Sequence, residues 1–203
     1  DCNIFLSSAN SINWGRLAPQ IVYYVSAYCD LLSTGKISVS EKLDVCVPSG
    51  NFGNIFAAYL AKRMGLPIGQ LICASNSNNV LTEFLTTGVY DRNRPFHKTI
   101  SPSMDILISS NLERLISILF GTQRTRELME RLRVDGRYSL TPDELEALRR
   151  DFSAYSTSEA ATAKIIKKTY EEKNCLTDPH TSVAIDAAAK YMNDHKAERK
   201  ILI

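Results

Sequence analysis

An apolar run at residues 43–47 leads straight into a polar turn with two glycines, and a helical pattern follows at residues 55–64. The turn reads Pro48-Ser49-Gly50-Asn51-Phe52-Gly53-Asn54. A buried strand that ends at glycines leaves backbone N–H groups free to point inward, and the next helix adds its unpaired N–H groups and its positive dipole end. The sequence therefore predicts a phosphate cradle formed by Ser49, Gly50, Asn51, Phe52, Gly53 and Asn54.

Two nucleotide motifs are poorly supported at this turn. It lacks the lysine and following Ser or Thr of a P-loop, and it lacks the G-x-G-x-x-G spacing of a dinucleotide site. The alternative interpretation is a plain strand-to-helix turn, in which Gly, Asn and Ser only satisfy backbone and capping needs. Spacing alone leaves these two interpretations open.

The region around the turn has the pattern of a βαβ unit. Gly65-Leu66-Pro67 ends the helix, and residues 70–74 form a short apolar run suited to a parallel strand. Ligands of such units bind at the carboxyl ends of the strands, where the turn falls. We therefore expect an α/β fold with three layers, in which helices flank an open, mostly parallel sheet.

Several further elements are predicted from periodicity. Residues 14–32 form a helical pattern that Pro19 weakens, residues 112–120 and 125–132 form two amphipathic helices, and Thr141 to Glu144 starts another helix with a capping box. Helices are also expected at residues 158–173 and 180–194, with a strand beginning at residues 200–203. This order predicts an α/β domain at residues 1–100 and 151–203, with a helical insertion at 101–150.

Composition narrows the class of protein. A chain of 203 residues that is 44% hydrophobic, with a net charge of +2, can bury a core, and its basic residues are not interleaved with aromatics as a nucleic-acid groove requires. The five cysteines form no C-x-x-C pair and lie mostly in apolar settings, so we expect reduced buried thiols in a cytoplasmic protein. No apolar run reaches the length of a membrane span. His97, His180 and His195 are scattered, so no metal site is predicted, and a capping or packing role is expected for His180.

Four motifs together resemble a known family. They are Ser8-Ala9-Asn10-Ser11-Ile12-Asn13-Trp14-Gly15-Arg16, the turn with Ile55-Phe56-Ala57-Ala58, Ser101-Pro102-Ser103-Met104-Asp105-Ile106, and Asp178-Pro179-His180-Thr181. In this order, spread over most of the chain, they resemble threonine synthase of the longer, microbial and fungal type. The chain opens at Asp1 and stops within an apolar run, so it looks like an internal or C-terminal piece of such an enzyme.

The resemblance implies a pyridoxal-phosphate enzyme of the tryptophan synthase β-like fold, fold type II. Its reaction would convert O-phospho-L-homoserine and water to L-threonine and phosphate, and its partners would be that substrate and the remaining segments of the same enzyme. The turn would then hold the phosphate of pyridoxal phosphate. The first motif lies near the substrate's phosphate in this family, which nominates Asn10, Ser11, Asn13 and Arg16.

The nominated residues also have simpler explanations. Asn10 and Ser11 could cap a helix and Arg16 could be solvated, although its planar fork of donors suits a phosphate. Asn54 could serve both the cradle and the substrate pocket. Asn76 and Asn79 match the family as well, but a capping role for the next helix explains them equally.

One element of the family is absent from the sequence. The lysine that forms a Schiff base with the cofactor belongs to a Phe-Lys-Asp type of motif, and no such run occurs here. We therefore expect these 203 residues to be inactive alone. The alternatives are another pyridoxal-phosphate lyase of the same fold and a non-catalytic phosphate-binding module.

Overall fold

The computed structural model describes residues 12–196 and 199–203. Within these residues, four parallel strands form a sheet in the order β5-β2-β1-β6. Their bounds are β1 (Leu43–Pro48), β2 (Ile68–Ser75), β5 (Phe152–Ser156) and β6 (Ile201–Leu202). The predicted α/β class with a mostly parallel sheet is confirmed.

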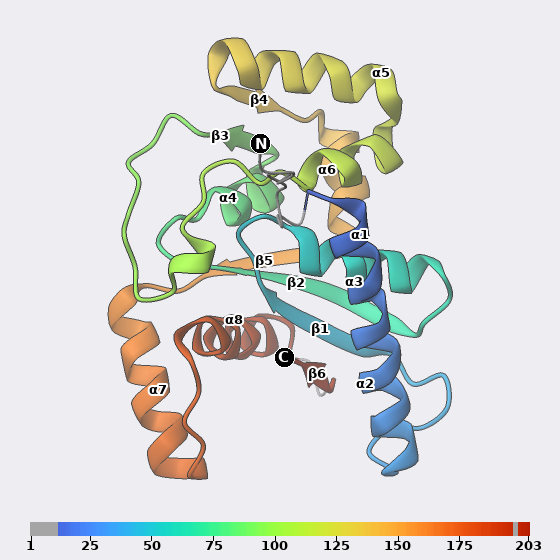
Figure 1. Ribbon diagram of the computed structural model, residues 1–203, viewed down its shortest axis with the longest axis vertical. Helices are drawn as coiled ribbons and strands as arrows, with labels where there is room; N and C mark the ends of the chain where they lie inside the picture. Colours follow the sequence, from blue (N-terminus) through green and yellow to red (C-terminus); the bar gives the residue numbers. More distant parts are fainter. Residues whose placement is uncertain (1–11, 197–198) are drawn as a thin grey trace, which may run out of the picture.

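Helices cover both faces of this sheet, as Figure 1 shows. On one face α3 (Gly53–Arg63) and α4 (Val80–Thr87) pack on the strands, and on the other lies α8 (Pro179–His195). Two more helices form outer layers: α2 (Ile21–Ser33) packs on α3, and α7 (Glu159–Lys173) packs on α8. Burial on both faces explains why β1 and β2 read as nearly continuous apolar runs.

Each face of the sheet has its own apolar core. Leu71 and Phe152 contribute to the core under α3 and α4, whereas Ile72 and Val183 contribute to the core under α8. Neighbouring residues of β2 therefore point to opposite faces, as the alternation of a strand requires.

Proline interrupts the helical pattern at residues 14–32 as expected, and a glycine lies at the break between the helices predicted at residues 112–120 and 125–132. The pattern at residues 14–32 is divided into α1 (Trp14–Leu17), a 3₁₀ turn at Ala18–Gln20 that contains Pro19, and α2. In α5 (Leu112–Asp135), Gly121 has φ 82° and ψ 166° and separates the two predicted halves. Among the described residues, no helix is long and apolar enough to cross a membrane.

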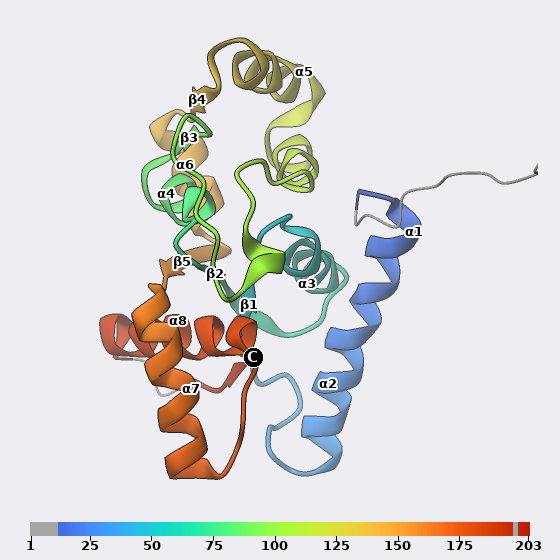
Figure 2. The same cartoon turned by 60° about the vertical axis from the view of Figure 1, so that its left-hand side comes forward.

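Three strands were missed by sequence reasoning. β3 (Val89–Asp91) pairs antiparallel with β4 (Arg137–Ser139), and neither these strands nor β5 were predicted. Each is short and depends on a distant partner; the rings of Tyr90 and Tyr138, for example, stack at 5.2 Å. Figure 2 shows α5, β3 and β4 together at the upper end of the molecule.

The proposed division into domains remains a prediction. The predicted insertion contains a 3₁₀ turn at Pro102–Met104, α5, β4 and α6 (Pro142–Arg149), whose capping box between Thr141 and Glu144 is formed. Pairing of β3 with β4 joins residues on both sides of the boundary at residue 100.

The cysteine prediction is partly wrong. Cys46 and Cys73 are buried free thiols, but Cys29 and Cys175 are exposed. Cys29 lies on α2 and Cys175 lies just beyond the end of α7, and the local apolar pattern does not reveal their exposure.

Candidate functional site

The turn at residues 49–54 lies at the carboxyl end of β1, between the sheet and α3. β1 ends at Pro48, α3 begins at Gly53, and the Ser49 N–H donates to the Ala74 carbonyl of β2 at 2.9 Å. The structure therefore places the six predicted cradle residues in one continuous segment, made of the turn and the first two residues of α3, at the ligand-binding edge of a parallel sheet.

The peptide groups of the turn are oriented by residues just before α5. The Ser109 hydroxyl donates to the Gly50 carbonyl at 2.6 Å, and the Asn111 side chain donates to the Asn51 carbonyl at 3.1 Å. Because a trans peptide directs its C=O and N–H groups in opposite directions, the N–H groups of Asn51 and Phe52 point away from Ser109 and Asn111. The acceptors of the turn are satisfied on one side, and its donors face the other.

Phe52 adopts an unusual backbone conformation just before α3. Its φ of 63° lies in the left-handed region, which is costly for a bulky residue. The side chain is 1% exposed and packs against Phe152, with ring centroids 5.6 Å apart. No described side chain caps the first turn of α3, so its N–H groups extend the donor set of the turn. Packing therefore holds a strained conformation at the point where these donors begin.

Gly50 allows a second loop to approach the turn. A Cβ atom at Gly50 would lie 3.1 Å from both the Met104 Cα and the Ser103 carbonyl oxygen. Both contacts are to backbone, which cannot swing aside as a flexible side chain can. Residues 101–106 therefore form a wall of the turn that only glycine accommodates without displacement.

Ser49 adds a buried hydroxyl. Its side chain is 6% exposed, and within the described chain its Oγ makes no hydrogen bond to nitrogen or oxygen. It lies beside the Cys73 thiol, whose pKa is raised to about 12 by burial, which keeps the thiol protonated at neutral pH. A buried polar atom, oriented backbone donors and a tight glycine contact together fit a phosphate group.

Asn54 is held by a tyrosine from α2. The Tyr24 hydroxyl donates to Asn54 Oδ1 at 2.5 Å, and burial raises the pKa of Tyr24, so that it remains a donor. A cavity of about 240 Å³, lined by residues of α2, β1 and β6, opens beside Pro48 and Asn54. A larger cavity, of about 630 Å³, lies along α5, but its Glu130 and Arg133 are paired with each other and it does not reach the turn.

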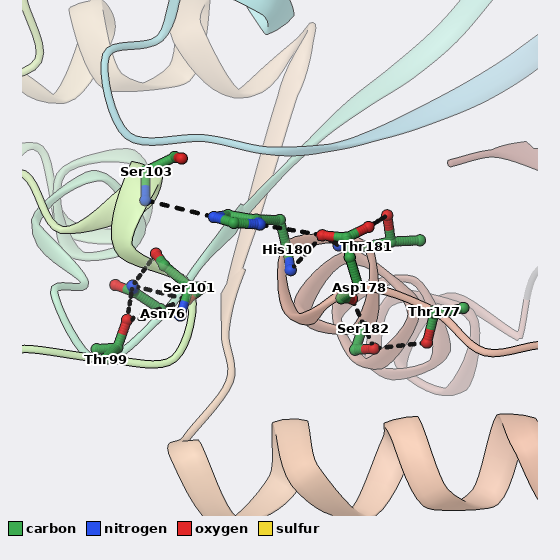
Figure 3. Close-up of polar contacts among 9 residues, drawn as sticks. All are labelled: Asn76, Thr99, Ser101, Ser103, Thr177, Asp178, His180, Thr181 and Ser182. Atoms are coloured by element: carbon green, nitrogen blue, oxygen red, sulfur yellow. Dashed lines mark hydrogen bonds and ion pairs between the residues drawn. The ribbon is translucent and has the colours of Figure 1, made fainter.

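A buried polar network fixes residues 101–106, called the wall loop below, to the end of β2. The Asn76 side chain donates to Asp105 Oδ1 at 2.8 Å and to the Ser101 hydroxyl at 3.0 Å, as Figure 3 shows for Ser101. The Asp105 carboxylate also accepts from the Thr99 N–H at 2.9 Å and from the Asn78 side chain at 3.0 Å. Burial raises the pKa of Asp105, but the hydrogen bonds from Thr99, Asn76 and Asn78 outweigh it and leave the pKa lowered.

This network corrects the capping interpretation of Asn76 and Asn79. The Asn76 side chain binds the loop, and the Asn79 side chain accepts from Arg94 at 3.1 Å, so neither side chain caps α4. In the sequence, this role was indicated by the run of asparagines directly after a buried strand, because polar side chains there face the ligand-binding edge of the sheet. The role of Asp105 in this polar network was not predicted from the sequence.

The predicted substrate residues are only partly described. Asn10 and Ser11 lie outside the described residues. Asn13 caps α1, since its Oδ1 accepts from the Gly15 N–H at 2.9 Å, and Arg16 is on the exposed part of the same helix. α1 contacts α3, so these two residues stand near the helix that starts at the turn.

The chain is similar in sequence to known proteins. The chain is 51% identical over 182 residues to human threonine synthase-like 1, covering 88% of this chain and 24% of the relative. It is 36% identical over 213 residues to threonine synthase of Schizosaccharomyces pombe, covering 94% of this chain and 41% of that protein. No protein family model matches the chain.

A solved structure agrees over nearly the whole chain. The pyridoxal-phosphate-bound threonine synthase of Brucella melitensis superimposes with a TM-score of 0.87 at 40% identity, covering 97% of this chain and 41% of that structure. This confirms the expected tryptophan synthase β-like fold. The chain thus spans between about a quarter and two fifths of the length of the proteins it matches. It belongs to the threonine synthase family.

Proposed function

We propose that this chain is part of a threonine synthase that uses pyridoxal phosphate to convert O-phospho-L-homoserine and water to L-threonine and phosphate. The observation that carries the proposal is the turn at residues 49–54, whose carbonyls are taken by Ser109 and Asn111 and whose N–H groups are directed away from them. The family relationship supports the identity of the phosphate bound there. A cytoplasmic location is part of the proposal, supported by the buried free thiols of Cys46 and Cys73.

The residues of the turn have separate roles in this proposal. Backbone donors from Asn51 to Asn54 would hold the cofactor phosphate, with the Ser49 hydroxyl beside them and no lysine required. Bound pyridoxal phosphate would supply the electron sink for the reaction. Residues 101–106 would exclude water from the Gly50 side, and Tyr24 would orient the Asn54 amide toward the cavity beside it.

Absorbance titration of the intact protein with pyridoxal phosphate tests the cofactor site. We expect saturable binding, and much weaker binding of pyridoxal, which lacks the phosphate that the turn would hold. Release of phosphate together with formation of threonine from O-phospho-L-homoserine tests the reaction. Equal affinity for pyridoxal and pyridoxal phosphate would contradict the assigned role of the turn.

The missing lysine leads to a related proposal. We infer that the lysine that joins to the cofactor is supplied by a part of the protein outside these 203 residues, because none of Lys36, Lys42, Lys62 or Lys98 has the family's surroundings. Borohydride reduction of the loaded protein, followed by peptide mapping, locates that lysine. A label on one of these four residues would contradict the inference.

A second candidate function is favoured by one comparison. Identity is higher to human threonine synthase-like 1, at 51%, than to the S. pombe threonine synthase, at 36%. The second candidate is therefore a relative that binds pyridoxal phosphate in the same cradle without making threonine. Cofactor binding with no threonine formed from O-phospho-L-homoserine would select it.

Removing the Tyr24 hydroxyl should loosen the turn. Tyr24→Phe should lower the free energy of unfolding by about 1 kcal/mol and weaken pyridoxal-phosphate binding by about threefold, because Asn54 loses its donor. Tyr28→Phe is a matched control from the same helix, since the Tyr28 hydroxyl donates to Glu41 at 3.0 Å, away from the turn. Urea unfolding should show similar stability losses for the two variants. Cofactor titration should show a changed affinity only for Tyr24→Phe.

Arg16 is proposed to bind the substrate's phosphate. Arg16→Ala should raise the KM for O-phospho-L-homoserine by about tenfold or more and lower kcat less, as expected for the loss of a charge-assisted contact. Arg63→Ala is a suitable control, because Arg63 lies at the far end of α3 from the turn. Steady-state kinetics of the intact enzyme measure both. An unchanged KM for Arg16→Ala would remove this residue from the substrate site.

A further inference from the structure

Two motifs that lie far apart in the sequence meet beside the turn. The Ser103 N–H of the wall loop donates to His180 Nε2 in the first turn of α8 at 3.3 Å (Figure 3). Met104, the next residue, is buried against α8 in the core that includes Val183. The wall loop is therefore attached to α8 as well as to β2.

Asp178 fixes the orientation and tautomer of His180. Its Oδ1 accepts from the His180 N–H at 2.9 Å and lies 3.0 Å from His180 Nδ1. Because an ionised carboxylate only accepts, Nδ1 carries the proton, and Nε2 is left with the lone pair that the Ser103 N–H needs. Hydrogen bonds, of which the one from the Thr181 side chain has the largest effect, lower the pKa of Asp178 to about 2. The carboxylate is therefore ionised at neutral pH.

The loop that His180 holds is the loop that closes on Gly50. The Ser103 carbonyl oxygen and the Met104 Cα both come within 3.1 Å of the position of a Gly50 Cβ. On its other side, the loop is fixed by the Asn76 contacts to Ser101 and Asp105. A shift at Ser103 would therefore reach the peptide groups of the turn directly.

We propose that His180 is a positioning residue of the cofactor site, which accepts the Ser103 N–H and so holds residues 101–106 against the turn. This inference rests on the proposed function of the turn. The residue acts through the loop and not on the reacting atoms. The simple alternative is that His180 only stabilises the start of α8.

Three variants of the intact protein separate these roles. His180→Leu removes the acceptor, and His180→Gln retains one on a side chain of similar reach. Thr181→Val is the matched control, because the Thr181 hydroxyl donates to Asp178 Oδ2 at 2.5 Å and strengthens the same helix start. Within the described residues, the side-chain hydrogen bond of Thr181 goes to Asp178 and not to the wall loop.

Hydrogen exchange without cofactor provides the first measurement. His180→Leu should speed exchange in residues 101–106 by about tenfold, because the Ser103 amide loses its acceptor. His180→Gln should stay within about threefold of the wild type. Thr181→Val should lower the thermal midpoint without changing exchange in this loop. Unchanged exchange in His180→Leu, or an equal change in Thr181→Val, would overturn the proposal.

Pyridoxal-phosphate titration provides the second measurement. His180→Leu should weaken binding by about tenfold, with recovery in His180→Gln and no change in Thr181→Val. If the loop loosens but affinity is unchanged, the positioning role is overturned while the proposed function stands. If the wild type itself binds no pyridoxal phosphate, the proposed function fails, whatever the exchange data show for the loop.

Discussion

Gly50→Val should weaken pyridoxal-phosphate binding by about 100-fold, the largest effect expected at the turn. Even the first carbon added at this position would meet the Met104 Cα and the Ser103 carbonyl oxygen at 3.1 Å, and valine adds two methyl groups beyond it. Either the wall loop or the turn must move, and movement of the turn redirects the N–H groups of Asn51 and Phe52. Titration of the intact protein, followed by absorbance, measures the loss.

Gly35→Ala is the control for general damage caused by replacing a glycine. Gly35 has a φ of 66°, so alanine is strained there by about 1 kcal/mol, but apart from its chain neighbours no atom of the described residues lies within 4 Å of the added carbon. This variant should lose stability in urea unfolding and keep its affinity for the cofactor. The loss of cofactor affinity in Gly50→Ala should lie between the losses in Gly35→Ala and Gly50→Val, because a shift of a few tenths of an ångström accommodates one carbon. Near wild-type affinity in Gly50→Val would show that the wall loop does not shape the phosphate site.

The position of the turn could be predicted from the sequence because its determinants are local, whereas its role as a phosphate cradle remains a prediction. A buried run, two glycines and a following helix are adjacent in the chain, and together they specify a turn at the carboxyl edge of a parallel sheet. The same locality explains the interruption predicted at Pro19 and the break between the helices predicted at residues 112–120 and 125–132, where the structure places Gly121. The capping box of α6 is a further local signal.

What the sequence did not reveal depends on contacts between distant segments. β3 has three residues and acquires its structure from β4, more than forty positions later. The need for glycine at position 50 comes from Ser103 and Met104, and the side chain of Asn76 is used by Ser101 and Asp105. No local pattern encodes these pairings, so the sequence left a capping role and a role at the site equally open for Asn76 and Asn79.

The wall loop and the turn also differ in how they are stabilised. The turn joins β1 and α3, whose apolar residues belong to one large core. The wall loop contributes Met104 to the core under α8 and is also fixed by polar contacts to Asn76, Asn78 and His180. Polar networks of this kind are costly when a partner is removed. Substitutions in the network should therefore loosen the wall before they disturb the sheet.

Asp105→Ala should consequently lower the free energy of unfolding by about 3 kcal/mol at pH 7. The carboxylate accepts from the Thr99 N–H at 2.9 Å, the Thr99 hydroxyl at 2.7 Å and the Asn76 and Asn78 side chains at 2.8 and 3.0 Å. Alanine removes the acceptor of the Thr99 N–H and one acceptor each from Asn76 and Asn78, which are buried at 0% and 4% exposure and keep their bonds to Ser101 and to the His97 carbonyl. Urea unfolding of the intact protein measures the loss, and one below about 1 kcal/mol would contradict the network's role.

Acid should remove the same stabilisation in the wild type. The pKa of Asp105 is lowered in the folded protein, so its ionised form is favoured there relative to the unfolded chain. Its contribution is therefore complete above the unfolded pKa of about 3.9 and is lost as the pH falls through the lower folded value. Asp105→Asn has nearly the same shape and does not titrate, so the stability difference between the wild type and this variant should shrink in that acidic range. A difference that stays constant from pH 7 down through that range would mean that the Asp105 charge does not stabilise the wall loop.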